Sequence, residues 1–361
     1  MTSAAPAATT GTATSATSAT TTGTATSAAS AATAEAVASA AATSVASNAA
    51  IRPSDAVLTA QDATLAAVTS WRFGALQALR DLDVYRLDPN APALTSSVVS
   101  SVGSVEGGTA YGRRFQQGLT QISSRSDRRF DYDGYRNYIG LSLKQTFGRS
   151  SFDTGTGLSS EVSASVHSTW IADNGVFLAA IGRFTSMSLD YGSSNAFGNN
   201  ARGRTSVLAG DMAISVGTKL AVLDGIYLAP DLTLGYGTFA VRDFTDSSGV
   251  SIRSNRLTTG SGTAGLTLGY QDETTLRGGL NLYARVALVQ PFGDNLILTA
   301  SKDGGTISPE VLNQNRLSAD YSIGGRIRIQ DGVSVLIEGG RTTGPTLASS
   351  YTARARLDLT W

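Results

Sequence analysis

Residues 351–361 read YTARARLDLTW, and their side chains alternate between two kinds. Every second position from Tyr351 to Trp361 is apolar, and the positions between hold Thr352, Arg354, Arg356, Asp358 and Thr360. Because successive side chains of a β-strand point to opposite faces, this pattern predicts a strand with one apolar and one charged face. The apolar face ends on an indole, a ring that settles at membrane–water interfaces.

The same alternation recurs through the second half of the chain. In residues 276–290, LRGGLNLYARVALVQ, leucines and other apolar side chains occupy one face, while Asn281 and Arg285 occupy the other. Comparable runs cover residues 208–222, 226–236 and 316–330. Strands of soluble proteins usually have ~5–6 residues, whereas a tilted strand needs ~9–11 residues to cross a bilayer. The longer runs of this chain therefore favour membrane strands.

The connections between these runs differ in length. Short ones cover residues 172–175, 223–225, 271–275 and 330–332. Longer polar ones lie near residues 148–157, 192–203, 244–254, 303–316 and 343–349. Counted back from the C-terminus, short and long connections alternate, which is typical of bacterial outer-membrane barrels with tight periplasmic turns and longer outer loops.

The number of strands indicates a closed barrel. Ten runs are clear back to about residue 138, and weaker runs at 95–106 and 109–123 bring the number to twelve. Single-chain bacterial barrels have an even number of strands, and an open sheet edge in lipid would leave backbone groups unpaired. We therefore predict an all-β fold, a closed antiparallel transmembrane β-barrel over residues 95–361. A soluble sandwich or solenoid, with the apolar face inside, would show the same alternation and is the structural alternative.

The N-terminal part of the chain lacks this alternation. Residues 1–50 are almost wholly Ala, Thr and Ser, and such a composition cannot bury enough apolar surface to offset the entropy of ordering. We expect a disordered tail or the remnant of an exported segment, with helical potential in the alanine-rich residues 31–47. From Leu58 to Leu79, apolar residues recur at helical spacing, which predicts one α-helix over residues 54–86.

Composition excludes several kinds of function. The 28 Lys and Arg residues balance 28 Asp and Glu residues, and there is no cysteine. A neutral chain does not attract nucleic acid through its net charge. The arginines within residues 113–129 are interleaved with Asp127 and Asp131, which indicates a solvated or lumen-facing cluster. Without cysteine, disulfides, thiolate metal sites and thiol catalysis are excluded. No stretch reaches the ~18 uninterrupted apolar residues of a transmembrane helix.

Three local motifs are similar to known sites but lack their context. FDTGTG at residues 152–157 is similar to the Asp-Thr-Gly loop of aspartic proteases, a chemistry that needs two such carboxylates. GSGTAG at residues 260–265 fits a dinucleotide fingerprint but leads into a strand rather than a helix. His167 is the single histidine, and it cannot build a zinc site without cysteines or clustered carboxylates. We expect no catalytic residue, cofactor or metal, and hence no enzyme.

Four stretches resemble the translocator domain of monomeric autotransporters, the type V secretion family of Gram-negative bacteria. They are WIADNGVFLAAIGRF (170–184), GTKLAVLDGIYLAPDLTLGY (217–236), GLNLYARVALVQPFGDN (279–295) and YTARARLDLTW (351–361). Gly225, Tyr227 and Pro230 match the family pattern of a short turn, a Gly-aromatic strand start and a proline within the strand. The resemblance covers about residues 54–361. It implies a twelve-stranded outer-membrane barrel with the 54–86 helix threaded through its lumen.

The resemblance also implies a function and partners. The barrel would export or display its own N-terminal passenger at the cell surface, without enzymatic activity. It would contact outer-membrane lipid as a monomer, bind no nucleic acid and be inserted by the barrel assembly machinery after escort by periplasmic chaperones. A free-standing porin-like channel and an outer-membrane adhesin are the alternative functions.

Two features depart from the family pattern. Arg356 stands where the family usually has a glycine, five residues before the terminal aromatic residue. The chain also contains no β-helix passenger, so it is either the C-terminal piece of a longer protein or carries a degenerate passenger. No Asn-Asn pair occurs in residues 31–90, and Asn48 is not assigned the cleavage role that such a pair has in some family members.

Two groups of residues are the candidate site. The resemblance implies an assembly signal on the lipid-facing side of the last strand, formed by Tyr351, Leu357, Leu359 and Trp361. The polar face of that strand, with Arg354, Arg356 and Asp358, is expected to face the lumen. We further expect contacts between lumen arginines and the acidic end of the helix, which also includes Asp88. These helix and lumen residues are Asp81, Asp83, Arg285, Arg326 and Arg328.

Overall fold

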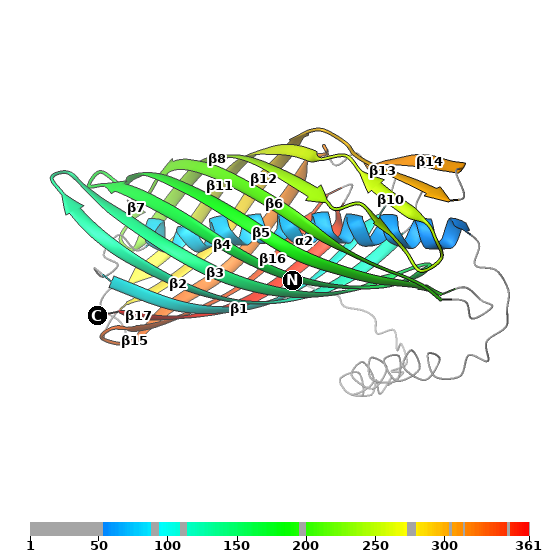
Figure 1. Ribbon diagram of the computed structural model, residues 1–361. Helices are drawn as coiled ribbons and strands as arrows, with labels where there is room; N and C mark the ends of the chain where they lie inside the picture. Colours follow the sequence, from blue (N-terminus) through cyan, green and yellow to red (C-terminus); the bar gives the residue numbers. More distant parts are fainter. Residues whose placement is uncertain are drawn as a thin grey trace, which may run out of the picture. The chain divides into compact units, whose positions relative to one another are not determined.

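The computed structural model describes residues 53–87, 94–108, 114–194, 200–272, 279–302, 305–312, 315–344 and 347–360. In these residues, long antiparallel strands form a closed barrel around one helix, α2 (Pro53–Leu87) (Figure 1). The expected tail of residues 1–50, its alanine-rich part and Trp361 lie outside the described residues.

The barrel has twelve strands. In chain order they are β1 (Leu94–Gly108), β2 (Arg114–Tyr132), β3 (Tyr135–Phe152), β4 (Gly155–Ala172), β5 (Val176–Ser194), β6 (Asn200–Thr218), β8 (Ile226–Val241), β11 (Leu257–Asp272), β12 (Leu280–Gly293), β15 (Ser318–Gln330), β16 (Val333–Thr343) and β17 (Leu347–Thr360). Each strand pairs with the next in this order, and β7 (Leu220–Leu223) pairs only with β8. The first and last strands also pair, with Thr95 opposite Thr360, so the described sheet closes on itself and the predicted barrel is confirmed.

The barrel wall is apolar outside and polar inside. The exposed large side chains include Leu141 and Leu143 on β3, Leu232 and Leu234 on β8, and Ile323 on β15. Polar residues of the alternate positions are buried, among them Asp231, Asp320 and Arg356. An apolar face that points away from the interior excludes the soluble sandwich, because that fold buries its apolar face.

The two ends of the barrel differ. At the end where β1 starts and β17 stops, turns such as Asp133–Gly134 and Asp331–Gly332 are tight. At the other end, the long connections carry β9 (Phe244–Thr245), β10 (Ser251–Ser254), β13 (Leu296–Lys302) and β14 (Gly305–Leu312), which form a separate four-stranded sheet. Short turns identify the first end as periplasmic and the second as extracellular.

Three predicted boundaries need correction. The long connection expected near residues 148–157 is wrong, because β3 runs to Phe152 and β4 begins at Gly155. The polar segments 244–254 and 303–316 were expected as loops, yet they contain β9, β10 and β14. Outside the membrane both faces of a strand can be polar, so the period-two pattern is lost although the backbone is paired.

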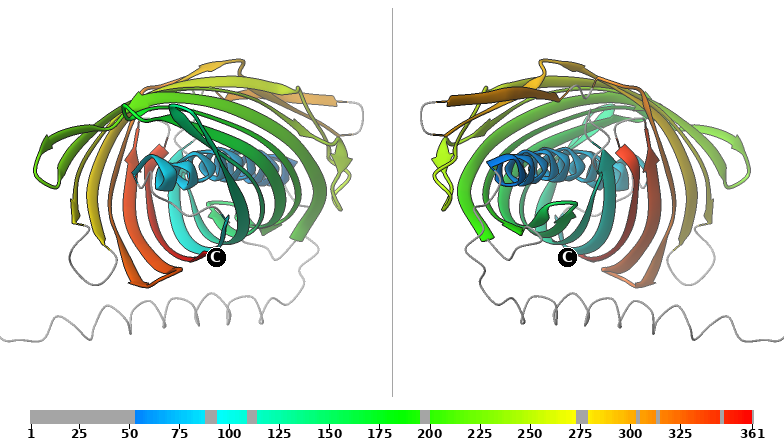
Figure 2. Two further views of the ribbon diagram at one scale, coloured as in Figure 1. Left: turned by 90° about the vertical axis from the view of Figure 1, so that its left-hand side faces the viewer. Right: turned by 90° about the vertical axis from the view of Figure 1, so that its right-hand side faces the viewer.

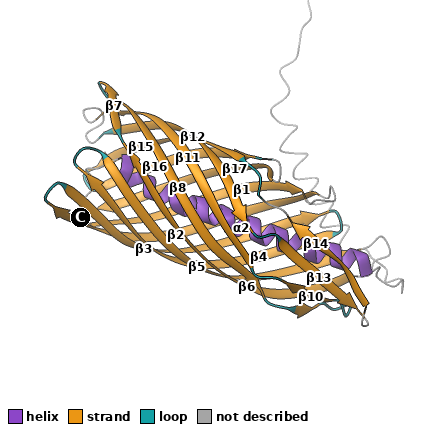
Figure 3. Cartoon of the chain, turned by 90° about the horizontal axis from the view of Figure 1, so that it is seen from above, coloured by secondary structure: helices purple, strands orange, loops and turns teal. Residues whose placement is uncertain are grey.

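The helix lies inside the barrel along its length (Figures 2 and 3). It extends one residue beyond each end of the predicted 54–86 segment. Its first turns lie near the extracellular sheet, and its last turns lie near the start of β1. Among the described residues, no helix is long and apolar enough to cross a membrane.

Candidate functional site: the helix and the barrel lumen

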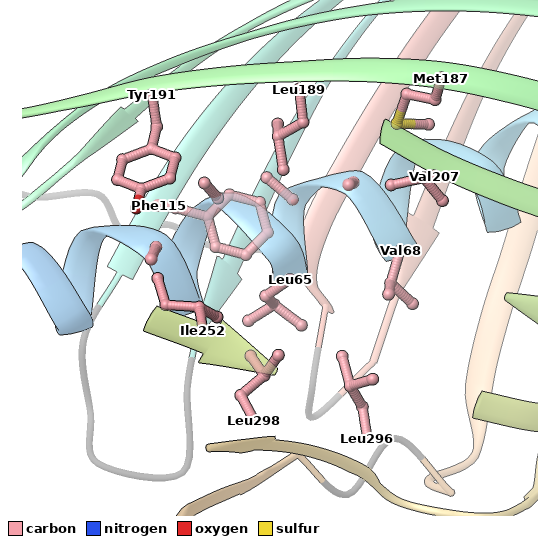
Figure 4. Packing of buried hydrophobic residues seen from close by; sticks show 14 of the residues in the cluster. Leu65, Val68, Phe115, Met187, Leu189, Tyr191, Val207, Ile252, Leu296 and Leu298 are labelled. Carbon is pink, nitrogen blue, oxygen red and sulfur yellow. The ribbon is translucent and has the colours of Figure 1, made fainter. Parts of the chain in front are cut away.

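The extracellular half of α2 packs in an apolar collar. Leu65 and Val68 of the helix lie among inward side chains of the wall and of the extracellular sheet (Figure 4). The wall residues are Phe115, Met187, Leu189, Tyr191 and Val207, and the sheet residues are Ile252, Leu296 and Leu298. The four-stranded sheet therefore acts as an apolar cover for the helix where the helix leaves the barrel.

Small and hydroxyl residues allow this part of the helix to fit a narrow lumen. Ala56, Ala60, Ala63 and Ala67 are each at most 1% exposed, so the wall encloses the helix closely. Thr59, Thr64 and Thr69 each donate a 2.9 Å hydrogen bond to the carbonyl four residues earlier. This back-bonding satisfies the buried hydroxyls, and the Thr59 hydroxyl also contacts Thr154 of the wall.

The middle of α2 is held by polar contacts to the wall. The Trp71 indole Nε1 donates to the Asp211 carboxylate at 2.9 Å, and its ring lies 5.5 Å from Phe239 between centroids. Arg183 links the same two residues, because its guanidinium lies 2.8 Å from the Asp211 carboxylate and donates a 2.8 Å hydrogen bond to the Trp71 carbonyl. Arg72 donates at 2.9 Å to Thr259 of β11, which lies two strands from Asp211 in the same cross-strand row.

A glycine in the helix makes room for two wall cations. Lys144 donates to the Gly74 carbonyl at 3.3 Å and lies 3.8 Å from Glu161, whose carboxylate is 3.7 Å from Arg183. A Cβ at Gly74 would lie 2.5 Å from Arg183 Nη1 and 2.6 Å from Lys144 Nζ. Glycine lowers helix stability by ~1 kcal/mol relative to alanine, so its presence here is explained by the space that these cations need.

Gly74→Leu tests this arrangement. Leucine favours a helix more than glycine does, so an isolated helix would become more stable. In the barrel we expect the opposite, a loss of about 1–3 kcal/mol in helix docking from overpacking. Hydrogen–deuterium exchange of residues 53–87 should become faster. Gly118→Leu is the control, because a Cβ at this outer-wall position would have no atom within 4 Å; equal or slower helix exchange in Gly74→Leu would contradict the steric argument.

The periplasmic end of α2 is held by arginines of strands on both sides of the barrel seam. Arg354 forms a 2.9 Å ion pair with the Asp81 carboxylate and a 3.1 Å pair with Glu338. The Asp81 carbonyl accepts a 2.7 Å hydrogen bond from Arg125 and a 3.4 Å contact from Arg356. Arg125 belongs to β2 and the other two to β17, so the helix joins both sides of the closing seam.

A second ionic cluster holds the neighbouring residue of the same helical turn, Arg80. Arg80 donates to Asp320, lies 3.6 Å from Glu338 and is buried. Glu338 also accepts a 2.5 Å hydrogen bond from the Tyr283 hydroxyl. Since Glu338 contacts both Arg80 and Arg354, the two helix anchors share one acidic wall residue.

The predicted lumen residues divide into those that meet the helix and those that do not. Asp81 meets three wall arginines, as described above. Arg285 pairs with Asp231 at 2.8 Å and borders the small gap beside Leu76, Leu79 and Arg80. Arg326 contacts Ser334 and Asp358 within the wall, and the Arg328 side chain is half-buried on the same strand. The side chain of Asp83 and the whole of Asp88 lie outside the described residues.

Sequence reasoning did not assign helix contacts to Lys144, Arg125, Arg183, Arg354 or Arg356. The polar face of each strand was readable, and Arg354 and Arg356 were expected in the lumen. The position of the helix along the barrel axis could not be predicted from the sequence. That position decides which wall arginine or lysine contacts which turn of the helix. A basic residue at an inward strand position is the only sequence signal that such contacts offer.

The last strand presents the expected two faces. Tyr351, Leu357 and Leu359 are exposed on the outer surface, while Arg354, Arg356 and Asp358 are buried in the lumen. Arg356 donates to Asp358 at 2.5 Å in addition to its contact with the helix. The arginine that replaces the family's usual glycine therefore fills lumen space and touches α2.

The motifs that are similar to enzyme sites form ordinary parts of the barrel wall and of its turns. Asp153 and Thr154 form the β3–β4 turn, and GSGTAG lies within β11, where Gly260 faces Phe292 and Gly265 faces Arg285. His167 lies in the lumen wall, 2.5 Å from Asp127 and 2.8 Å from Arg125. In the described part of the chain, no group of three or more His, Asp or Glu residues is arranged to hold a metal ion.

Comparisons with known proteins agree with this geometry. A family model described as the autotransporter beta-domain matches residues 98–340. The pertactin autotransporters of Bordetella parapertussis and Bordetella bronchiseptica are each 24% identical over 276 residues, which are 71% of this chain and 29% of theirs. The chain thus spans less than a third of the length of these curated relatives.

Solved structures show the same fold. The translocator domain of the autotransporter NalP from Neisseria meningitidis has a TM-score of 0.67 at 14% identity and covers 82% of this chain and 98% of its own. The beta domain of the Bordetella autotransporter BrkA has a TM-score of 0.57 at 15% identity, covering 74% and 98%. The transport unit of AIDA-I from Escherichia coli has a TM-score of 0.58 at 10% identity, covering 76% and 92%.

Proposed function

Because the chain belongs to the autotransporter beta-domain family, we propose that it exports or displays the segment that precedes its helix at the surface of a Gram-negative cell. The barrel is an outer-membrane translocator domain, as its family and fold neighbours are. Its work is transport and anchoring, and it catalyses no reaction. The passenger is the part of the protein N-terminal to Pro53, and it stays linked to the barrel through α2.

The direction of the helix carries this proposal. Thr59 of α2 contacts Thr154 of the extracellular β3–β4 turn at 2.7 Å, whereas Asp81, further along the helix, contacts Arg354 in the middle of β17. The chain thus enters the lumen from the extracellular side and continues into β1 at the periplasmic side. A segment preceding the helix would therefore emerge outside the cell. This path also explains why one helix without a transmembrane apolar run lies within a barrel.

The helix opposes the alternative of a free-standing open channel. Its extracellular half is enclosed by the apolar collar, and its periplasmic half is held by the Arg80 and Asp81 clusters. An adhesin would need its binding surface on the extracellular sheet or on the preceding segment. We take display of that segment as the primary role, and any adhesive activity would belong to the segment.

Insertion is proposed to depend on the barrel assembly machinery and periplasmic chaperones. The outward side chains of β17, Tyr351, Leu357 and Leu359 together with Trp361, would form the signal that this machinery recognises. The barrel is proposed to act as a monomer, because its closed ring pairs every barrel strand on both sides. No nucleotide is required for passage, and passenger folding together with binding to the assembly machinery supplies the driving force.

Epitope tags in intact cells test the direction of export. The chain is expressed behind an export signal with one tag before Pro53 and, in a matched variant, one tag in the Asp331–Gly332 turn. We expect antibodies to label the first tag on intact cells and the second only after the outer membrane is permeabilised. A protected N-terminal tag, together with a surface-labelled 331–332 tag, would show that the barrel does not display its N-terminal segment.

A further inference from the structure

The outer wall of the barrel carries a trough at the seam between the first and last strands. It has a volume of about 860 Å³ and lies on the outward faces of β17 and β1 through β5. Sites for small organic ligands have volumes of about 300–1,000 Å³, so the trough is large enough for a lipid chain. It is distinct from the lumen, because outward and inward side chains alternate along each strand.

Two cross-strand rows of outward residues build the trough. The first row reads Leu359, Ser96, Ser126, Leu141, Val166 and Gly182 across β17, β1, β2, β3, β4 and β5. The second row, in the same strand order, reads Leu357, Val98, Ser124, Leu143, Ala164 and Phe184. Leucines of β17 and β3 form the two ridges. Small side chains of β1 and β2 form the floor between them.

The floor is unusual for a surface that faces hydrocarbon. Ser96, Ser124 and Ser126 place hydroxyl groups where the flanking strands place leucine. A hydroxyl in an apolar environment is costly unless it has a hydrogen-bond partner. The serines thus supply donors at a depth where a membrane lipid carries its glycerol and ester oxygens.

A positively charged side chain, that of Arg128, lies at the periplasmic end of the trough. Arg128 is the next outward residue after Ser126 on β2, about 7 Å further along the strand. It pairs with Leu94 on one side and Ile139 on the other, so it continues the line of the floor. Its side chain is exposed, and its guanidinium lies 5.2 Å from the Phe130 ring.

Aromatic residues place Arg128 at the membrane surface. Tyr132 and Tyr135 flank the adjacent turn and stack with ring centroids 4.8 Å apart. Tyrosine and tryptophan concentrate at the headgroup level of membranes. Arg128 lies two outward positions from Tyr132, about 13 Å along the strand, and its long side chain extends toward the phosphates of the periplasmic leaflet. At that level an outward arginine costs about 0–1 kcal/mol, against about 2–4 kcal/mol at the bilayer midplane.

We propose that the trough is a binding site for one glycerophospholipid of the periplasmic leaflet. Its phosphate binds Arg128, its glycerol and ester oxygens accept hydrogen bonds from Ser126 and Ser96, and one acyl chain lies over Ser124 and Val98 between the leucine ridges. Along the trough, the arginine comes first, the serine hydroxyls second and the apolar channel third. A glycerophospholipid has its phosphate, its glycerol and ester oxygens and its acyl chain in the same order. The lipid would cover the seam where β1 meets β17.

Native mass spectrometry of the full chain, released from detergent micelles, tests the site. The micelles contain phosphatidylglycerol, phosphatidylethanolamine or the phosphate-free diacylglycerol as probes. We expect one phospholipid to be retained per chain and no diacylglycerol. Arg128→Gln should weaken retention about tenfold, because a charge-assisted contact is lost. Ser126→Leu, which fills the floor, should weaken it at least as much.

The control is Arg204→Gln, an outward arginine of β6 that pairs with Asp190 at 3.4 Å and lies away from the trough. It should retain the lipid as the unchanged protein does. Each variant is first shown to be a folded barrel, which migrates differently on SDS gels with and without boiling, and only folded variants are compared. Unchanged retention in both Arg128→Gln and Ser126→Leu, or equal retention of diacylglycerol, would overturn the proposal. So would a dimer that Ser126→Leu dissociates, since a second copy would then be the occupant.

Discussion

Asp81→Lys is expected to raise the single-channel conductance of the barrel in planar bilayers several-fold. The Asp81 carboxylate is the helix partner of Arg354, and the Asp81 carbonyl is held by Arg125 and Arg356. A lysine would place a fourth cation among three arginines. The pair is partly buried, so breaking it costs less than the about 3–5 kcal/mol of a fully buried pair, and the added repulsion shifts the periplasmic end of the helix away from the wall. Adding Asp83→Lys should increase the effect if its side chain also meets the lumen.

A charge exchange separates this electrostatic explanation from general damage. Arg354→Asp alone should also raise conductance, because it leaves Asp81 beside a second carboxylate and removes one of the two arginines that contact Glu338. The double variant Asp81→Arg with Arg354→Asp restores one attractive pair and should lower conductance relative to either single variant. Asp55→Lys, in the first turn of the helix, is the control for charge change alone. Unchanged conductance in Asp81→Lys would show that the pair does not hold the helix.

Deleting Leu359 through Trp361 is expected to abolish insertion of the barrel. The deletion removes Leu359 from its pairing with Ser96 and Val333, and Thr360 from its pairing with Thr95. It therefore opens the seam at the periplasmic end, where unpaired backbone groups would meet lipid at several kcal/mol each. It also removes two members of the proposed assembly signal. The heat-modifiable form on gels of outer-membrane fractions should be absent.

Two further variants separate the effect of the lost side chains from the effect of the lost backbone pairing. Leu359→Ser keeps the full backbone pairing and changes one outward side chain, so a partial loss of insertion in cells would assign a role to the side chain itself. Refolding of the same variant from denaturant into detergent, without cellular factors, should be close to normal. Removal of residues 1–50 is the control, and the barrel should still insert. Normal insertion of the Leu359–Trp361 deletion would refute the proposed signal.

The outer surface of the barrel could be predicted residue by residue. Leu232, Leu234 and Tyr236 were assigned to one face from their spacing alone, and all three are exposed on the outer wall. The prediction succeeds where outward positions are apolar, because a strand has a fixed period of two and lipid favours apolar side chains at most outward positions. It failed at residues 148–157 and 244–254, where the strands extend beyond the membrane and that demand ends.

Amino-acid pattern alone determined the long two-faced strands, the helix of residues 54–86 and the two faces of YTARARLDLTW. Strand length, the connections and the terminal aromatic strand then favoured a closed barrel over a soluble sandwich. Only the tertiary structure decided that Arg354 and Arg356 meet Asp81, that Gly74 makes room for Lys144 and Arg183, and that serines of β1 and β2 share one trough with leucines of β17. Alternation is a local property, since each residue's face follows from its neighbours. Contacts between wall and helix depend on strand register, on barrel stagger and on the depth of the helix, which arise only when distant segments pack together.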